Sequence, residues 1–184
     1  MYHGLVFYTR LENPRIRDYR KKYDPTSKLI DDHISIIFPV PEIITEAQIT
    51  KHIANILSRW KTFNVRINGF MKNWDHLLFL TLLDGNEDVI RLFNEMYSGI
   101  LKPYFRKDLP FTPHIGIGFF GKGEFDIFNP NKHLDLDEEK YTKALNELKR
   151  IKIDEWRYLD RLTLVSLSDD LSELNNLREF KLKS

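Results

Sequence analysis

The sequence predicts an α+β fold in which mainly antiparallel strands line a groove and helices pack outside it. Two observations support this prediction. Apolar runs of strand length alternate with segments of helical apolar spacing, and the order strand, helix, strands occurs twice along the chain. Each occurrence holds one histidine near the start of an apolar strand, in residues 32–38 and 111–118. We therefore expect residues 1–184 to form one domain of two lobes with a weak internal duplication.

Composition narrows the class of protein. The chain has 184 residues and is 42% hydrophobic, enough for one sizeable core. Its 28 Lys and Arg residues nearly balance 27 Asp and Glu residues, so no global field favours nucleic acid or an anionic membrane. The absence of cysteine excludes disulfides, thiolate nucleophiles and Cys-based zinc sites. Without a signal peptide or a spanning apolar run, we expect a soluble, cytoplasmic monomer that does not bind membranes.

The first half contains two well-marked helices. Asn13 suits a helix cap and Pro14 the first turn, and Thr45 followed by Gln48 is a capping-box signature. The cations of the first helix form either a solvated face or a rim that attracts anions. The expected elements are a strand at Gly4–Thr9, a helix at Asn13–Tyr23, the His33 strand, a helix after Thr45, and strands at Val65–Phe70 and His76–Leu83.

The second half repeats this order. Residues 124–137 form a polar loop with aromatic residues, long enough to move or to cover something. The expected elements are a helix over residues 87–100 that ends or kinks at Pro103, the His114 strand, a helix at Asp137–Ile151, a strand at Leu159–Leu167 and a final strand near Arg178–Leu182.

The two histidine strands are expected to face the groove in the same way. Alternate side chains of a strand point to opposite faces, so His33 shares a face with Ser35. In the second strand, Thr112, His114 and Gly116 share the equivalent face.

Unperturbed imidazole titrates near neutral pH, so it can either accept or donate a proton there. Of two histidines that face one groove, one can therefore act as the general base and the other as the general acid, and no metal is needed. This chemistry suits a phosphodiester, above all a strained cyclic one. A hydroxyl two residues after each histidine could donate to the charged phosphate oxygens, and Ser35 fits that role. Histidines on buried strands are also commonly structural groups, and spacing alone does not separate the two interpretations.

Residues 33–35 and 114–116 resemble the two His-x-Thr/Ser motifs of the 2H phosphoesterase superfamily, which includes the LigT-like 2′-5′ RNA ligases and cyclic phosphodiesterases. The flanking segments Tyr19–Pro25, Phe111–His114 and Leu159–Phe180 are similar to the YjcG-like bacterial branch of phosphoesterases. The resemblance covers most of the chain, and residues 124–137 match it least.

The resemblance implies a bilobed fold with a pseudo-twofold axis, both motif strands lining a central cleft, and no metal or other cofactor. The implied substrates are 2′,3′-cyclic phosphates of RNA ends or of nucleotide-derived metabolites, or 2′-5′ linkages in RNA. His33 and His114 carry over as the acid and base, although the sequence does not say which is which, and Ser35 carries over as the phosphate-binding hydroxyl.

The chain departs from the family pattern at Gly116, where the second motif has Thr or Ser. Losing one such donor typically costs about 10² to 10³ in turnover. Thr112 could compensate from the other side of His114, and so could the Gly116 backbone N–H if the strand is bulged there. The alternative function is therefore an RNA- or nucleotide-binding module with weak or lost catalysis. A further alternative is a cleft that serves a protein partner.

Several other side chains are weaker candidates for substrate contacts. Arg106 could neutralise a phosphate, and Tyr23 could stack on a base. Arg20, Lys22 and Lys107 could likewise neutralise a phosphate. Tyr104 and Phe105 could likewise stack on a base.

Overall fold

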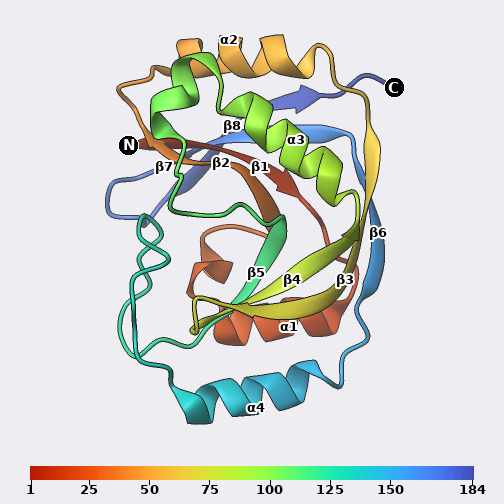
Figure 1. Cartoon of the computed structure of the whole chain (residues 1–184), viewed down its shortest axis with the longest axis vertical. Coiled ribbons are helices and arrows are strands. Elements are labelled where there is room, and N and C mark those ends of the chain that lie inside the picture. Colours follow the sequence, from red (N-terminus) through yellow and green to blue (C-terminus); the bar gives the residue numbers. More distant parts are fainter.

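The computed structural model describes all 184 residues as eight strands, four α-helices and two 3₁₀ helices (Figure 1). The strands are β1 (Tyr2–Tyr8), β2 (His33–Pro41), β3 (Phe63–Asn73), β4 (Leu77–Asp84), β5 (His114–Phe119), β6 (Asp154–Leu159), β7 (Arg161–Leu167) and β8 (Leu174–Lys181). The helices are α1 (Pro14–Tyr23), η1 (Pro25–Lys28), α2 (Glu46–Leu57), α3 (Asn86–Met96), η2 (Gly99–Tyr104) and α4 (Glu138–Leu148).

The strands form two four-stranded sheets, in the orders β2-β1-β7-β8 and β5-β4-β3-β6. All neighbouring strands in both sheets are antiparallel, which confirms the predicted α+β fold. The two histidine strands, β2 and β5, are each the edge strand of their sheet. They also contact one another, so the two sheets meet along the strands that carry the motifs.

The helices cover the sheets in a crossed arrangement. Helix α3 follows a strand of the second sheet but packs against β2 of the first, and α1 follows β1 but packs against β5. In Figure 1, α2 and α3 lie at the top of the molecule and α1 and α4 at the bottom. Each sheet is therefore packed against a helix that follows a strand of the other sheet.

One core of 36 buried hydrophobic residues reaches both sheets. Ile34 and Ile36 of β2 and Ile115 of β5 belong to it, each no more than 1% exposed. These residues alternate with the histidines, as the strand pattern predicts. Burial of the alternate residues thus fixes the face on which each histidine lies. No helix is both long and apolar enough to cross a membrane.

The helix starts follow the predicted caps. The Asn13 side chain accepts a hydrogen bond from the backbone N–H of Arg15 at 3.0 Å, at the start of α1. At the start of α2, Thr45 and Gln48 form both hydrogen bonds of a capping box. Both caps satisfy backbone N–H groups that would otherwise lack partners in the first helical turn.

The C-terminal part holds one strand more than predicted: β7 corresponds to the strand expected at residues 159–167, and β6 precedes it. Strand β6 is hard to recognise because its large aromatic residues face outward: Trp156 is 54% exposed and Tyr158 is 56% exposed. Only Leu159 of this strand is buried. The third predicted helix also ends earlier, at Leu148, and Pro103 lies inside η2.

Candidate active site

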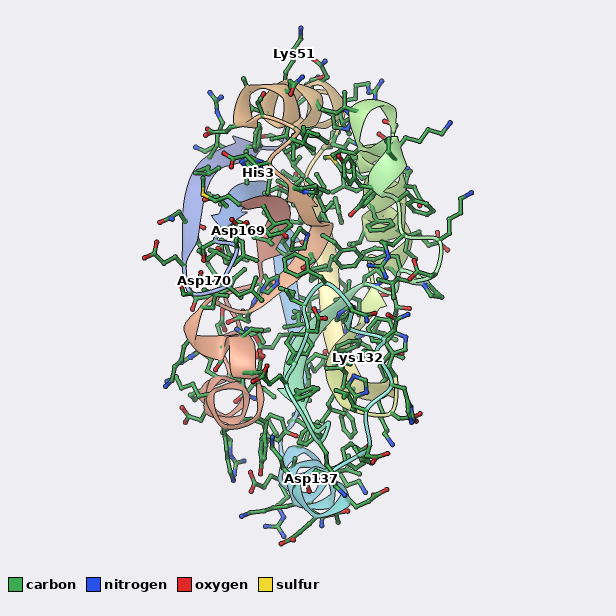
Figure 2. All side chains as sticks on the ribbon, turned by 90° about the vertical axis from the view of Figure 1, so that its left-hand side faces the viewer. His3, Lys51, Lys132, Asp137, Asp169 and Asp170 are labelled. Carbon is green, nitrogen blue, oxygen red and sulfur yellow. The ribbon has the colours of Figure 1, made fainter.

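A cavity of about 420 Å³ lies where the two sheets meet, and both motif histidines line it. Of its 35 lining residues, 21 are hydrophobic. Its walls come from both sheets, from residues 103–109 after α3, and from residues 125–130 of the long loop after β5. Figure 2 shows this loop, marked by Lys132, on the side of the molecule turned to the viewer. Segments far apart in the sequence therefore build one site.

His33 is the first residue of β2, opposite Tyr8 of β1. Its Nδ1 lies 2.8 Å from the backbone carbonyl oxygen of Asp31. Because a carbonyl only accepts hydrogen bonds, Nδ1 carries the proton and donates it. The Nε2 atom of the neutral ring therefore holds the free lone pair.

His114 repeats this arrangement at the start of β5. Its Nδ1 donates to the carbonyl oxygen of Thr112, two residues earlier, over 2.6 Å. The imidazole also stacks on Phe79, with ring centroids 3.7 Å apart and an interplanar angle of 19°. The same tautomer is thus fixed in both histidines by the same local contact, while the stacked ring further restricts His114.

The motif strands share a further irregularity. In β2, Ser35 and Ile37 pair with consecutive residues of β1, so Ile36 is an extra residue. In β5, Gly116 and Gly118 pair with consecutive residues of β4, so Ile117 is extra there. An extra residue of this kind is a β-bulge, which increases twist and redirects side chains. Each motif is therefore followed by a bulge at the same distance from its histidine.

Burial lowers the pKa of both histidines, but the charged groups around the two rings differ. For His114, burial lowers the pKa to about 4, the Thr112 carbonyl opposes this, and the charge of His33 lowers the pKa further. For His33, burial also lowers the pKa and the Arg20 cation lowers it further, whereas the Asp31 carbonyl and the carboxylates of Asp24 and Asp32 oppose them. Both rings line the same cavity, on strands that contact one another.

The position two residues after each histidine differs between the strands. Ser35 is half-buried in the cavity wall, and its hydroxyl makes no hydrogen bond to the protein. Gly116 lines the same cavity, and a Cβ atom placed there would meet no atom within 4 Å. Glycine at this position therefore leaves open space.

Arg20 of α1 is a buried cation in the cavity wall and only 5% exposed. Its Nε donates to Asp24 at 2.7 Å and to the Gly116 carbonyl at 3.2 Å, and its Nη2 donates to the Ile30 carbonyl at 2.9 Å. Its Nη1 makes no hydrogen bond to the protein. The guanidinium is thus rigidly held beside Gly116 with one nitrogen uncommitted.

Sequence reasoning gave Arg20 no more weight than its basic neighbours, because α1 looks like a solvated face. A signal was present, since Arg20 shares a helical stripe with Ile16, Tyr19 and Tyr23, all of which are buried. A charged residue on an apolar stripe either is paired or has a specific role.

The other predicted contact residues fall in different places. Arg106 lines the cavity, but Asp108 and the Phe128 carbonyl engage its guanidinium. Tyr23 is 5% exposed and packs against aromatic rings of the core, so its ring is not presented to a ligand. The Thr112 side chain is exposed outside the cavity and contributes only its carbonyl. Lys22 and Lys107 do not line the cavity either, so these two residues, Tyr23 and Thr112 lie apart from the other predicted residues.

No group of three or more His, Asp and Glu side chains is placed to hold a metal ion. Beside one another the cavity offers two imidazoles, the Ser35 hydroxyl and the buried guanidinium of Arg20. These groups suit proton transfer beside a bound anion.

The model of one protein family, described as the 2′-5′ RNA ligase superfamily, matches residues 7–161. The chain belongs to the 2′-5′ RNA ligase superfamily. A Bacillus licheniformis protein named "putative phosphoesterase" is 22% identical over 172 residues, which cover 89% of this chain and 99% of the relative. The sequence resemblance to LigT-like proteins and to their YjcG-like branch is thereby confirmed.

Solved structures of other proteins show a similar fold. A structure of the Thermus thermophilus protein TT0787 has a TM-score of 0.61 and 15% identity. The E. coli LigT structure with NADP⁺ has a TM-score of 0.57 and 13% identity. Each comparison covers 100% of this chain and 98% of the other. E. coli LigT has also been solved with ATP and with 3′-AMP, so that protein binds nucleotides.

Proposed function

We propose that this chain is a metal-independent phosphoesterase that opens a cyclic phosphodiester, with His33 and His114 as its acid–base pair. One observation supports the proposal most directly. Two imidazoles from the edge strands of different sheets line one cavity, each with its Nδ1 fixed by a carbonyl. Each ring therefore has Nε2 available for proton transfer. Membership of the superfamily and nucleotide binding by E. coli LigT support the same reaction class.

The surroundings of the rings favour His114 as the base and His33 as the acid. A base must be neutral, and the low pKa of His114 keeps it so above about pH 4. An acid must hold a proton, and the Asp31 carbonyl with the carboxylates of Asp24 and Asp32 favours the protonated form of His33 against burial and the Arg20 cation. Two titratable groups whose environments differ in this way can divide the two roles.

The reaction is an addition of water. His114 Nε2 takes a proton from water as the water oxygen bonds to phosphorus. The bond between phosphorus and one ring oxygen breaks, and His33 Nε2 gives its proton to that oxygen. The product is a phosphomonoester with a free hydroxyl. A 2′-5′ linkage would be cleaved by the same two proton transfers.

The charge that develops on the phosphate oxygens needs fixed donors. The Ser35 hydroxyl is one, since it is free of protein partners in the cavity wall. We assign Arg20 Nη1 as the second, in place of the hydroxyl that Gly116 lacks. Arg20 already donates to the Gly116 carbonyl, so its guanidinium lies at the position where the second motif departs from the family pattern.

The test is a turnover assay in EDTA with 2′,3′-cyclic nucleotides, oligonucleotides that end in a cyclic phosphate, and 2′-5′-linked dinucleotides. The wild type is compared with His33→Ala and His114→Ala, with folding checked by circular dichroism. Turnover that persists in EDTA and falls at least about 10²-fold in each variant is expected. Activity that is unchanged in either variant, or abolished by EDTA, contradicts the mechanism.

The second candidate function is a nucleotide-binding module with weak catalysis. Gly116 and the lowered pKa of both histidines favour it, because a hydroxyl is missing and neither ring is readily protonated near pH 7. Binding of these substrates by the wild type without turnover would select this function.

A further inference from the structure

The cavity has two chemically different parts. The polar part holds the histidines, Ser35, Arg20 and Asp24, and the remainder is walled largely by aromatic and aliphatic side chains. The aromatic residues on this wall are Phe38, Trp74, Phe79, Tyr97, Tyr104, Phe105, Phe119, Phe125 and Phe128. A substrate that places its phosphate between the histidines must therefore place its remaining group against rings.

The aromatic wall begins at the catalytic pair. Phe79 stacks directly on the His114 ring. Trp74 meets Phe79 edge-on with centroids 6.4 Å apart, and these rings belong to a small buried cluster with Phe119 and Phe125. The ring centroids of Phe125 and Phe119 are in turn 5.3 Å apart. The rings are thus continuous with the site of proton transfer, within reach of a group attached to the same phosphate.

Much of this wall comes from the loop after β5, which supplies Phe125, Ile127, Phe128 and Pro130. The loop is held from outside its own sequence. Arg106, fixed by Asp108, donates from Nη1 to the Phe128 carbonyl at 3.0 Å. The buried His76 lies with Nε2 3.1 Å from the Pro130 carbonyl, to which it donates. These two residues therefore act as positioning residues that fix the loop as one wall of the cavity.

The charges of the cavity suit a single phosphate. Its lining contains two permanent cations, Arg20 and Arg106. Each is paired with a carboxylate, at 2.7 Å with Asp24 and at 2.6 Å with Asp108. The cavity lining holds no further lysine or arginine to meet a second phosphate. Binding of nucleic acid strands depends on cations that meet successive phosphates.

The size of the cavity agrees with its charge. A volume of about 420 Å³ falls in the range of about 300–1,000 Å³ that is usual for small-molecule sites. A phosphate with one ring-bearing group matches a site of this size, whereas a strand of several nucleotides would extend beyond the cavity.

We propose that the aromatic wall is a subsite for one planar aromatic group, of nucleobase size, on a small substrate with a single phosphate, and that it disfavours oligonucleotides. The inference rests on the proposed function for the placement of the phosphate. The wall is built in part by residues 124–137, the segment of the chain that least resembles the family pattern. Arg106 and His76 have the role of holding that wall rather than touching the phosphate.

Binding of product-like probes tests the subsite without any need for turnover. Calorimetry would compare adenosine 3′-monophosphate with glycerol 2-phosphate, which has no base, with hexyl phosphate, which has a flexible chain, and with a 3′-phosphorylated adenosine dinucleotide. The nucleotide is expected to bind at least about tenfold more tightly than the first two, since stacking on rings favours planar groups. The dinucleotide is expected to bind no more tightly than the mononucleotide.

Variants of the wall locate the effect. Phe125→Leu and Trp74→Leu, from different segments, should each reduce the preference for the nucleotide over glycerol 2-phosphate at least about fivefold. Phe70→Leu is the matched control, because Phe70 is 36% exposed and lies outside the cavity. Circular dichroism and thermal unfolding would show that each variant is folded.

The outcomes separate the subsite from the reaction. A preference below tenfold, tighter binding of hexyl phosphate or the dinucleotide, equal effects in the Phe70 variant, or no binding of any probe overturns the subsite. A clear preference for the nucleotide with no turnover of any cyclic phosphate overturns the proposed function and leaves the subsite standing. Turnover of a cyclic phosphate without a preference for the nucleotide overturns the subsite and leaves the proposed function standing.

Discussion

Strands β2 and β5 have the same backbone plan and different chemistry. Each begins with a histidine whose Nδ1 donates to the carbonyl two residues earlier, and each has a bulge after the second residue beyond it. On β2, however, the residue at that position is Ser35, opposite Val6 of the neighbouring strand. On β5 it is Gly116, opposite Phe79, whose ring stacks on His114.

The difference shows that repetition of a backbone does not repeat a function. The shared features fix the tautomer of both rings, which any acid–base pair needs. The charged neighbours differ, namely Arg20, Asp24 and Asp32 for His33 and the charge of His33 for His114, and they change how readily each ring takes a proton. In the proposed mechanism, the β2 half of the site is therefore the acid half and the β5 half is the base half.

The largest expected loss of rate comes from removing each imidazole, and it should be measured on two kinds of substrate. Loss of a general acid or base typically costs about 10² to 10⁴ in rate. The leaving group of a p-nitrophenyl phosphodiester needs no proton. The rate loss caused by His33→Ala should therefore be much smaller with this substrate than with one that has an alkoxide leaving group. The loss caused by His114→Ala should not differ in this way. Initial rates measure both, and a smaller loss in His114→Ala instead would reverse the assignment.

Replacing Arg20 should have the next largest effect. Arg20→Gln removes the proposed donor and should lower kcat about 10²- to 10³-fold. Lys21→Gln is the matched control, since Lys21 is exposed on the same helix. Because Arg20 and Asp24 form a buried pair, thermal unfolding would be measured in parallel, and Arg20→Lys would test charge without the same geometry. An unchanged kcat in folded Arg20→Gln would exclude the donor role.

The pH dependence of kcat/KM should reflect the difference between the two rings. Activity should rise through about pH 4, where His114 loses its proton and becomes a base. As the pH increases further, activity should fall before pH 6.5 is reached, because the pKa of the acid His33 is lowered from that value. The optimum is therefore expected between these limits, and a pH profile of the wild type measures it. His133→Gln, at an exposed position, should leave the profile unchanged, whereas an optimum above pH 7 would contradict the assignment.

The smallest expected effect is a gain. Gly116→Ser restores the hydroxyl of the family pattern, and its Cβ would enter open space. Since Arg20 already supplies a donor in our proposal, kcat should rise by about tenfold at most, less than the usual value of such a donor. Steady-state kinetics measures the change. A marked loss of activity would mean that the substrate uses the space that glycine leaves.

The sequence predicted the local parts of the fold well, because they depend on near neighbours. Helix α1 begins after Asn13 and α2 after Thr45, since the caps act within one turn. Strand β6 was missed for the same reason, because Trp156 and Tyr158 point outward and leave no buried alternation to detect. Patterns reveal a strand only where one of its faces is buried.

The sequence alone also determined the content of the two motifs. Alternation along a strand placed His33 with Ser35, and His114 with Gly116, before any fold was known, because side-chain direction depends on backbone geometry alone. It likewise exposed the missing hydroxyl at Gly116.

Only the tertiary structure decided which residues share the cavity. It brought the edge strands of two separate sheets together, turned Arg20 inward beside Gly116, and buried Tyr23 in the core. It also made the long loop a wall, held by Arg106 and His76. These outcomes depend on contacts between distant segments, and the periodicity of a single segment carries no information about the partner against which it packs.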